Sequence, residues 1–213
     1  MTVSASSSFS SNEIEQLCLK AARGAGLSWG LAEEAGVAAA WLVSQGIDGP
    51  EILLHLLRLG PLAGPTLPWR AQSLLQCPIR LGASLCDHAD LPQTDLAMRE
   101  IELGFVAMPL LLLPFLSRMA GSKHNSIELH GAGPRIILQS GESAVTIAQG
   151  TPIASQAHLR ISRGAEQPKK AALRHFTLSL ATIDALNIFA MRTTVPASEA
   201  SRAGAGASDR DID

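Results

Sequence analysis

Apolar residues recur at intervals of three and four along the first sixty residues, which predicts three short helices. The first is expected over 12–24 and can begin with a capping box formed by Asn12 and Glu15. The second (28–46) and the third (49–60) are each bounded by serine, glycine or proline, residues that favour helix ends. The front of the chain therefore predicts a compact helical cluster.

From Ser126 onward apolar and polar residues alternate, which is typical of half-buried strands. The expected strands lie at 126–130, 135–139, 143–149, 159–161 and 176–180. Alternation at 79–85 predicts one more strand, and 182–191 predicts a late helix. The turns between the strands are short, so antiparallel pairing in sequence order is expected.

The most apolar window runs from Leu103 to Ser117, fifteen residues without a charge. As a helix it would span about 22 Å, short of the roughly 30 Å hydrocarbon core of a bilayer. Pro109 and Pro114 also interrupt it. The window therefore predicts a buried central helix and not a membrane span.

Together these elements predict an α+β fold. It combines an N-terminal cluster of three short helices, a central apolar helix, and a mainly antiparallel sheet of about five strands with a late helix. The expected divisions are a disordered serine-rich lead (1–11), a single domain (12–195) with a helical front (12–60) and a sheet-rich back (79–195), and a polar Gly/Ala tail (196–213). The proline- and glycine-rich segment 60–78 is expected to be an irregular connection.

Composition narrows the function classes. Seventeen Lys and Arg against nineteen Asp and Glu, with 4% aromatic residues, argue against a nucleic-acid-binding protein. Three cysteines are too few for a disulfide scaffold, which indicates a reduced, cytoplasmic protein. The N-terminus has neither the basic nor the apolar region of a signal peptide.

Motifs for nucleophilic catalysis or phosphate binding are missing from the sequence: no G-x-S-x-G, G-x-x-x-x-G-K-[ST] or G-x-G-x-x-G occurs. Glu33 and Glu34 lie near the start of the second helix, where either carboxylate could act as a general base. The helix dipole explains two carboxylates at that position equally well. Cys18 lies on the apolar face of the first helix and is expected to be a buried, inert thiol.

Three histidines each lie on the polar face of a predicted strand: His130, His158 and His175. If those strands are neighbours in register, their imidazoles could converge on a metal ion, with Glu128 nearby. Solvent-facing histidines are the alternative. No cofactor is predicted.

The sequence Cys86-Asp87-His88-Ala89-Asp90 follows the strand expected at 79–85. Its thiol, imidazole and carboxylates could form a metal or thiolate site. The alternative is a polar turn in which Asp87 or Asp90 bonds its own backbone, since no second Cys/His pair at zinc spacing is present.

The tail from 196 to 213 is composed of small and polar residues, which is typical of a disordered segment. Its polar and glycine residues also suit a binding role, because Gly-rich backbone can approach a partner closely and Arg202 could clamp a carboxylate. The candidate binding residues are Glu199, Ser201, Arg202, Gly204, Gly206, Asp209 and Asp211.

Three blocks of the sequence carry a resemblance: KAARGAGLSWGLAEEAGVAAAWLVSQGIDG from Lys20, PLLLLPFLSRMA from Pro109 and TTVPASEASRAGAGASDRD from Thr193. They resemble a family of bacterial proteins of about this length known only as a domain of unknown function. The resemblance implies a cytoplasmic proteobacterial protein in which the tail belongs to the family pattern. It implies no activity and no cofactor.

The first block also resembles the helical start of the lactate/malate dehydrogenase family that lacks a Rossmann fold. The Ser-His-Gly motif of that family is not found here, where the chain reads Leu54-His55-Leu56. Dehydrogenase chemistry is therefore not carried over.

Two functions remain open from the sequence. The first is a non-catalytic accessory or small subunit of a metabolic enzyme complex, with a protein partner or a homo-oligomer, no nucleic acid and no membrane. On this view Glu199 and Arg202 anchor the tail in the partner's groove. The second is a small-molecule enzyme that uses Glu33 or Glu34 as general base and the tail as a lid.

Overall fold

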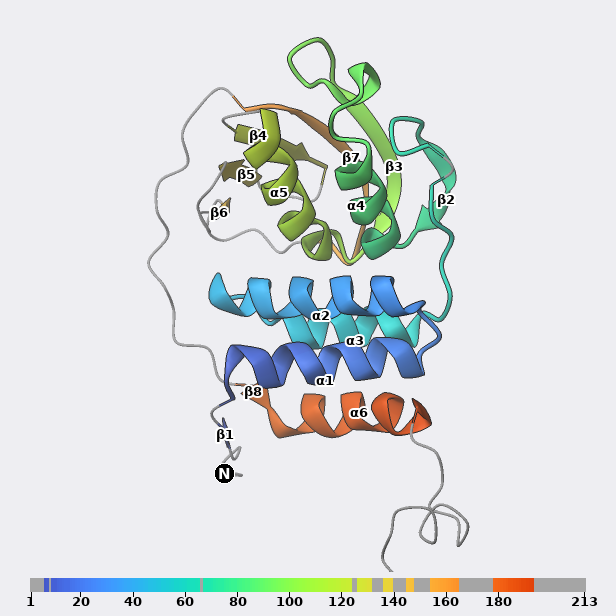
Figure 1. Cartoon of the computed structure of the whole chain (residues 1–213), viewed down its shortest axis with the longest axis vertical. Helices are drawn as coiled ribbons and strands as arrows, with labels where there is room; N and C mark the ends of the chain where they lie inside the picture. Colours follow the sequence, from blue (N-terminus) through green and yellow to red (C-terminus); the bar gives the residue numbers. More distant parts are fainter. Residues whose placement is uncertain are drawn as a thin grey trace, which may run out of the picture.

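The computed structural model describes residues 6–7, 9–65, 67–123, 126–131, 136–139, 145–147, 154–164 and 178–193. It confirms the α+β fold class, with layers of helices stacked beside a sheet (Figure 1). The helices are α1 (Ser11–Gly24), α2 (Trp29–Ser44), α3 (Gly49–Arg58), α4 (Pro78–Asp87), α5 (Leu113–Lys123) and α6 (Leu180–Ala190). The strands are β1 (Ser6–Ser7), β2 (Gln72–Gln76), β3 (Ile101–Ala107), β4 (Ser126–His130), β5 (Ile136–Gln139), β6 (Val145–Ile147), β7 (Gln156–Arg163) and β8 (Leu178–Ser179).

The front helices form as predicted, with one correction at the start of α1. Its capping box uses Ser10 and Glu13, not Asn12 and Glu15: the Glu13 amide donates to Ser10 Oγ at 3.2 Å, and the Ser10 amide donates to Glu13 Oε2 at 2.8 Å. This start places Phe9 just before the cap, where it packs against the core that includes Ile14. Ser10 thus caps the helix two residues earlier than Asn12 would.

Within the described residues, the main sheet has six strands in the order β2-β3-β7-β4-β5-β6. Its β2–β3 pair is parallel, and the other four pairs are antiparallel. The insertion of β7 between β3 and β4 departs from the pairing in sequence order that the short turns predict. It places Arg160 of β7 opposite both Glu102 and His130.

The strand predicted at 79–85 is wrong, because this segment is helix α4. Pro78 occupies the first turn, and Ile79, Leu81 and Leu85 are all buried in the helix. Gly82 lets α4 approach α5 so closely that a Cβ there would lie 2.3 Å from the Phe115 ring. Alternation over a short apolar run could not separate the two structures.

The central apolar helix begins later than predicted. Leu103 to Ala107 belong to β3, Met108 has a left-handed φ of 42°, and a 3-10 turn at Pro109–Leu112 leads into α5 at Leu113. The segment 103–107 is a strand and not a helix because it pairs with β2 and β7 on either side. These pairings cannot be predicted from the sequence of the window alone.

Three further segments differ from expectation or lie outside the described residues. Strand β2 lies in the connection expected to be irregular. Within the lead expected to be disordered, β1 pairs with β8 in a separate two-stranded sheet. His175 and the tail lie outside the described residues. In the part of the chain that is described, no helix combines the length and apolar character needed to cross a membrane.

Candidate functional site

The outer face of the sheet brings His130 and His158 together, as expected from the sequence if their strands were neighbours. His130 on β4 lies opposite Arg160, two residues from His158 on β7. On this face the His130 Nε2 lies 2.9 Å from Ser162 Oγ, and its Nδ1 lies 3.7 Å from Glu128 Oε1. Strand register alone positions all three side chains, because Glu128 is paired with Ser162.

The same face continues across β7 to β3. His158 Nδ1 lies 3.8 Å from Glu102 Oε2, and its ring meets the edge of Phe105 at a centroid distance of 5.2 Å. The Arg160 guanidinium pairs with Glu100 at 3.2 Å. An open groove of about 330 Å³ is lined by Glu102, His130, Gly131, His158 and Arg160. It offers two imidazoles and charges of both signs to a small polar ligand.

The Ser162–His130–Glu128 row resembles a nucleophile, base and orienting acid in composition only. The 3.7 Å separation of His130 and Glu128 exceeds hydrogen-bond length. Ser162 also lies within a strand paired to β4, not on an exposed turn. We interpret the row as a polar network that ties β4 to β7.

A metal centre at these histidines stays a prediction. Its third candidate ligand, His175, lies outside the described residues. Among the residues that the structure does describe, no three His, Cys, Asp or Glu side chains are grouped so that they could hold a metal ion.

The two candidate general bases lie on α2, away from this groove. Glu34 forms a bidentate pair with Arg118 of α5, in which the guanidinium donates at 3.2 and 2.5 Å. The Arg118 side chain also lies over the Phe115 ring, 4.8 Å from its centroid. Glu33 is exposed. Glu34 therefore links the helical layers to α5.

The Cys86 motif lies at the end of helix α4, not after a strand. The Cys86 thiol donates to the Phe115 carbonyl at 3.4 Å, and burial raises its pKa to about 11. His88 Nδ1 lies 2.7 Å from the Ser84 carbonyl, and its ring meets Trp69 edge-on. These contacts favour a protonated thiol and a histidine that closes the helix end.

A polar groove between α3 and α6 was not found by sequence reasoning. It has a volume of about 390 Å³ and is lined by Asp48, Glu51, Leu54, Arg58, Ser179, Ala181 and Thr182. Thr182 donates a hydrogen bond to Glu51, whose other oxygen lies 3.1 Å from His55 Nε2. The cap position of Asp48 was readable from the sequence, but the return of α6 to α3 across more than a hundred residues was not.

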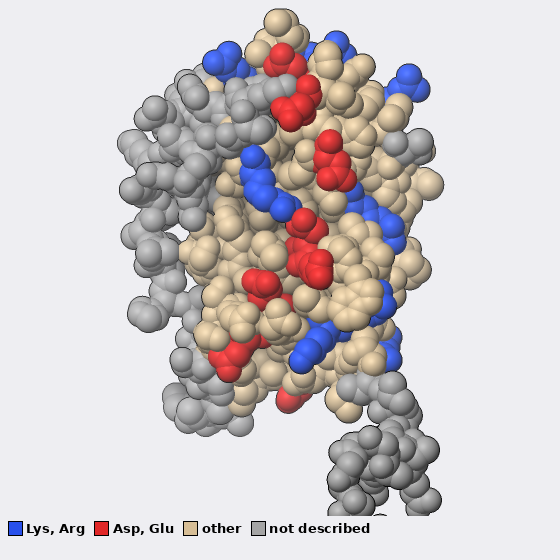
Figure 2. Space-filling view, in the orientation of Figure 1, with Lys and Arg blue, Asp and Glu red and all other residues tan. Residues whose placement is uncertain are grey.

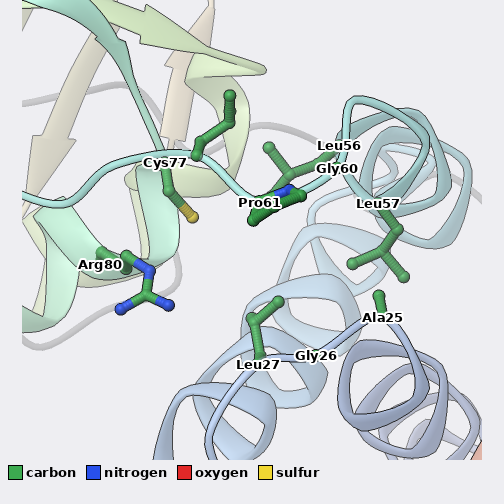
Figure 3. A pocket seen from close by; sticks show the side chains of 10 residues that line it. Ala25, Gly26, Leu27, Leu56, Leu57, Gly60, Pro61, Cys77 and Arg80 are labelled. Carbon is green, nitrogen blue, oxygen red and sulfur yellow. The ribbon is translucent and has the colours of Figure 1, made fainter.

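An apolar crevice lies where the α1–α2 loop, the end of α3 and the start of α4 meet (Figure 3). Leucines form its walls, and the Cys77 and Arg80 side chains face it. Burial raises the pKa of the Cys77 thiol. The crevice holds only about 30 Å³, room for about two waters, and is closed to larger ligands in this conformation.

Exposed apolar side chains lie at and beside the β2 edge of the sheet, which Ala63 bridges only at Gln76 among the described residues. Leu74 on the edge strand β2 is 65% exposed, and Phe105 on the neighbouring β3 is 48% exposed. Acidic and basic residues are interspersed on the face shown in Figure 2. The tail residues proposed to bind a partner lie outside the described residues.

Comparison with known proteins gives a family but no activity. No curated protein matches the sequence significantly. A crystal structure of malate dehydrogenase from Entamoeba histolytica is similar with a TM-score of 0.47 and 13% identity, over 68% of this chain and 49% of that one. The chain thus spans about half the length of that protein. Residues 9–132, more than half of the chain, match a family model, and this protein therefore belongs to the family described as Protein of unknown function (DUF3726).

Proposed function

We propose that this chain is a non-catalytic accessory or small subunit of a bacterial metabolic enzyme complex in the cytoplasm. The carrying observation is the β2 edge of the sheet, where Leu74 on the edge strand and Phe105 on the adjacent strand β3 are 65% and 48% exposed. An edge strand with apolar neighbours is a template for another protein chain. Cys18, Cys77 and Cys86 are all free thiols, which supports a reducing compartment.

In this proposal the tail (196–213) docks on the same partner. Glu199 and Arg202 supply ionic anchors, and the glycines at 204 and 206 let the backbone approach closely. Ser201, Asp209 and Asp211 supply further polar contacts. The composition of the tail is what supports this role.

Affinity capture from the organism that encodes the protein tests the proposal, with mass analysis of the intact eluate. Full-length protein is expected to bring one enzyme at a fixed ratio, and a chain ending at Val195 is expected to lose it. Phe105→Glu should lower the yield, whereas Met98→Glu, at a side chain 79% exposed in the turn before β3, should not. Equal yields from all four proteins would refute the proposal.

The alternative is a small-molecule enzyme that uses Glu33 or Glu34 as base. It has less support, because Glu34 is engaged by Arg118 and neither carboxylate lines the grooves described above. A substrate turned over by the purified chain, and lost in Glu33→Gln or Glu34→Gln, would establish it.

A further inference from the structure

Helix α6 forms the outermost layer of the helical stack, beside α1 (Figure 1). Its inner face buries Ile183, Leu186 and Ala190. The approach to α1 is close: a Cβ on Gly24 would lie 1.8 Å from the Phe189 carbonyl oxygen. The inner face of α6 is therefore tightly packed against α1.

The outer face of α6 is apolar at its centre. Ile188 projects opposite the buried side and is 65% exposed, and Met191 is 66% exposed. Ala181 and Asp184 on the same face are exposed too. A helix that is apolar on both sides usually has protein on both sides.

The charges on this outer face are self-complementary. Asp184 lies four residues before Ile188 in α6, about 6 Å away along the axis, and Arg192 lies four residues after it, in the 3-10 turn Met191–Thr193 that continues the helix, about 7 Å away. When two copies of α6 meet antiparallel across a two-fold axis at Ile188, each Asp184 comes level with Arg192 of the second copy. Two ion pairs then flank an Ile188–Ile188 contact.

Both charges are available for this role. Within the described residues, neither Asp184 nor Arg192 has an ion-pair partner in its own chain. The Arg192 guanidinium lies 4.5 Å from the Phe189 ring centroid, which holds it at the helix end. The small side chains of Ala181 and Ala185 allow close approach of a second helix.

We propose that the outer face of α6 is a homodimer interface, occupied by α6 of a second copy in antiparallel orientation. This surface differs from the sheet edge and tail assigned to the partner enzyme, so a dimer would present two such edges. One helix pair buries less than the roughly 1,200 Å² of a standard interface. The expected dimer is therefore weak, with a dissociation constant of about 1–100 μM.

Cysteine cross-linking tests the geometry in the full-length protein. A residue on a two-fold axis meets itself, so Ile188→Cys should form a disulfide-linked dimer under mild oxidation at tens of micromolar protein. Met98→Cys, at a side chain that is even more exposed (79% against 65%) and remote from α6 in sequence, is the control and should not. Equal cross-linking of the two variants would overturn the proposal.

Charge reversal tests the pairing by sedimentation equilibrium. Asp184→Arg and Arg192→Asp are each expected to weaken the dimer at least about tenfold, and the double variant should return to within about threefold of the parent. A parent that stays monomeric at 200 μM, or a double variant as weak as the singles, refutes the antiparallel pair. If only a chain ending at Val195 dimerises, the protein's own tail covers this face, and the proposal is wrong. None of these outcomes depends on capture of the partner enzyme.

Discussion

The helical stack and the sheet are stabilised by different means. The interface of α1 and α2 buries small side chains, including Ala21, Ala22 and Ala35, so backbones approach closely. The sheet buries large side chains such as Leu103, Leu129 and Leu159 on one face and carries a row of polar groups on the other. The helix interfaces of the stack should therefore tolerate no added volume, whereas the outer face of the sheet should respond mildly to lost contacts.

Added volume in the helical stack is expected to have the largest effect. Gly24→Ala should lower the free energy of unfolding by about 3 kcal/mol, because the new methyl group collides with the backbone of α6. Gly30→Ala in α2 is the control: nothing lies within 4 Å of its Cβ position, so a neutral or slightly stabilising effect is expected. Urea denaturation measures both, and equal effects would contradict the comparison.

The next largest effect is expected in thiol reactivity, which compares Cys18 on α1 of the helical stack with Cys86 on α4. Burial, followed by the charge of Asp48, raises the pKa of Cys18 to about 12, and burial raises that of Cys86 to about 11. At pH 8 a thiol-specific reagent should modify Cys86 about 100-fold more slowly than an unfolded cysteine, and Cys18 only through unfolding. A Cys86→Ala variant identifies which phase of the labelling time course belongs to Cys86. Rapid labelling of Cys18 would show that α1 opens locally.

The raised pKa values of Cys18 and Cys86 also make the stability of the fold depend on pH. In the unfolded chain the cysteine thiols ionise with an ordinary pKa of 9.0, whereas the folded thiols of Cys18 and Cys86 stay neutral to about 12 and 11. The stability they contribute is fully present below pH 9 and is lost as the pH rises through the folded values. Denaturation between about pH 8 and 11 should show a falling midpoint, with a smaller fall in Cys86→Ala.

Loss of one polar contact on the sheet should cost less. Ser162→Ala removes the hydrogen bond to His130 and is expected to lower the free energy of unfolding by about 1 kcal/mol. Ser155→Ala, at an exposed side chain just before β7, should have no measurable effect. A loss above about 3 kcal/mol would mean that the polar face is as intolerant as the helical stack.

The smallest effect is expected at the boundary of the two regions. Glu34→Gln weakens a half-exposed ion pair with Arg118 and should lower the free energy of unfolding by about 0.5–1 kcal/mol at low salt, and by less at about 1 M salt. Exposed Glu33→Gln should be neutral. Thermal denaturation at both salt concentrations distinguishes the pair from a packing effect.

Local signals in the sequence predicted much of this fold. Glycine and proline residues at the helix ends predicted the bounds of α2 and α3. The alternation of apolar and polar residues predicted β4, β5 and β7. It also placed His130 and His158 on polar faces, which is where they lie. The alternation at 79–85 failed because the run is short and α4 is buried on more than one face: Ile79 and Leu81 lie about 160° apart around the helix axis, yet both are buried.

The sequence by itself determined which segments are helices or strands at most positions, the polar face of the strands β4 and β7, and the burial of Cys18. Only the tertiary structure decided that β7 lies between β3 and β4, that Glu34 meets Arg118, and that α6 closes on Gly24 with Ile188 outward. The reason is physical. Propensity and periodicity act over a few residues, whereas these contacts join segments between about thirty and 165 residues apart, whose pairing depends on the packing of the whole chain.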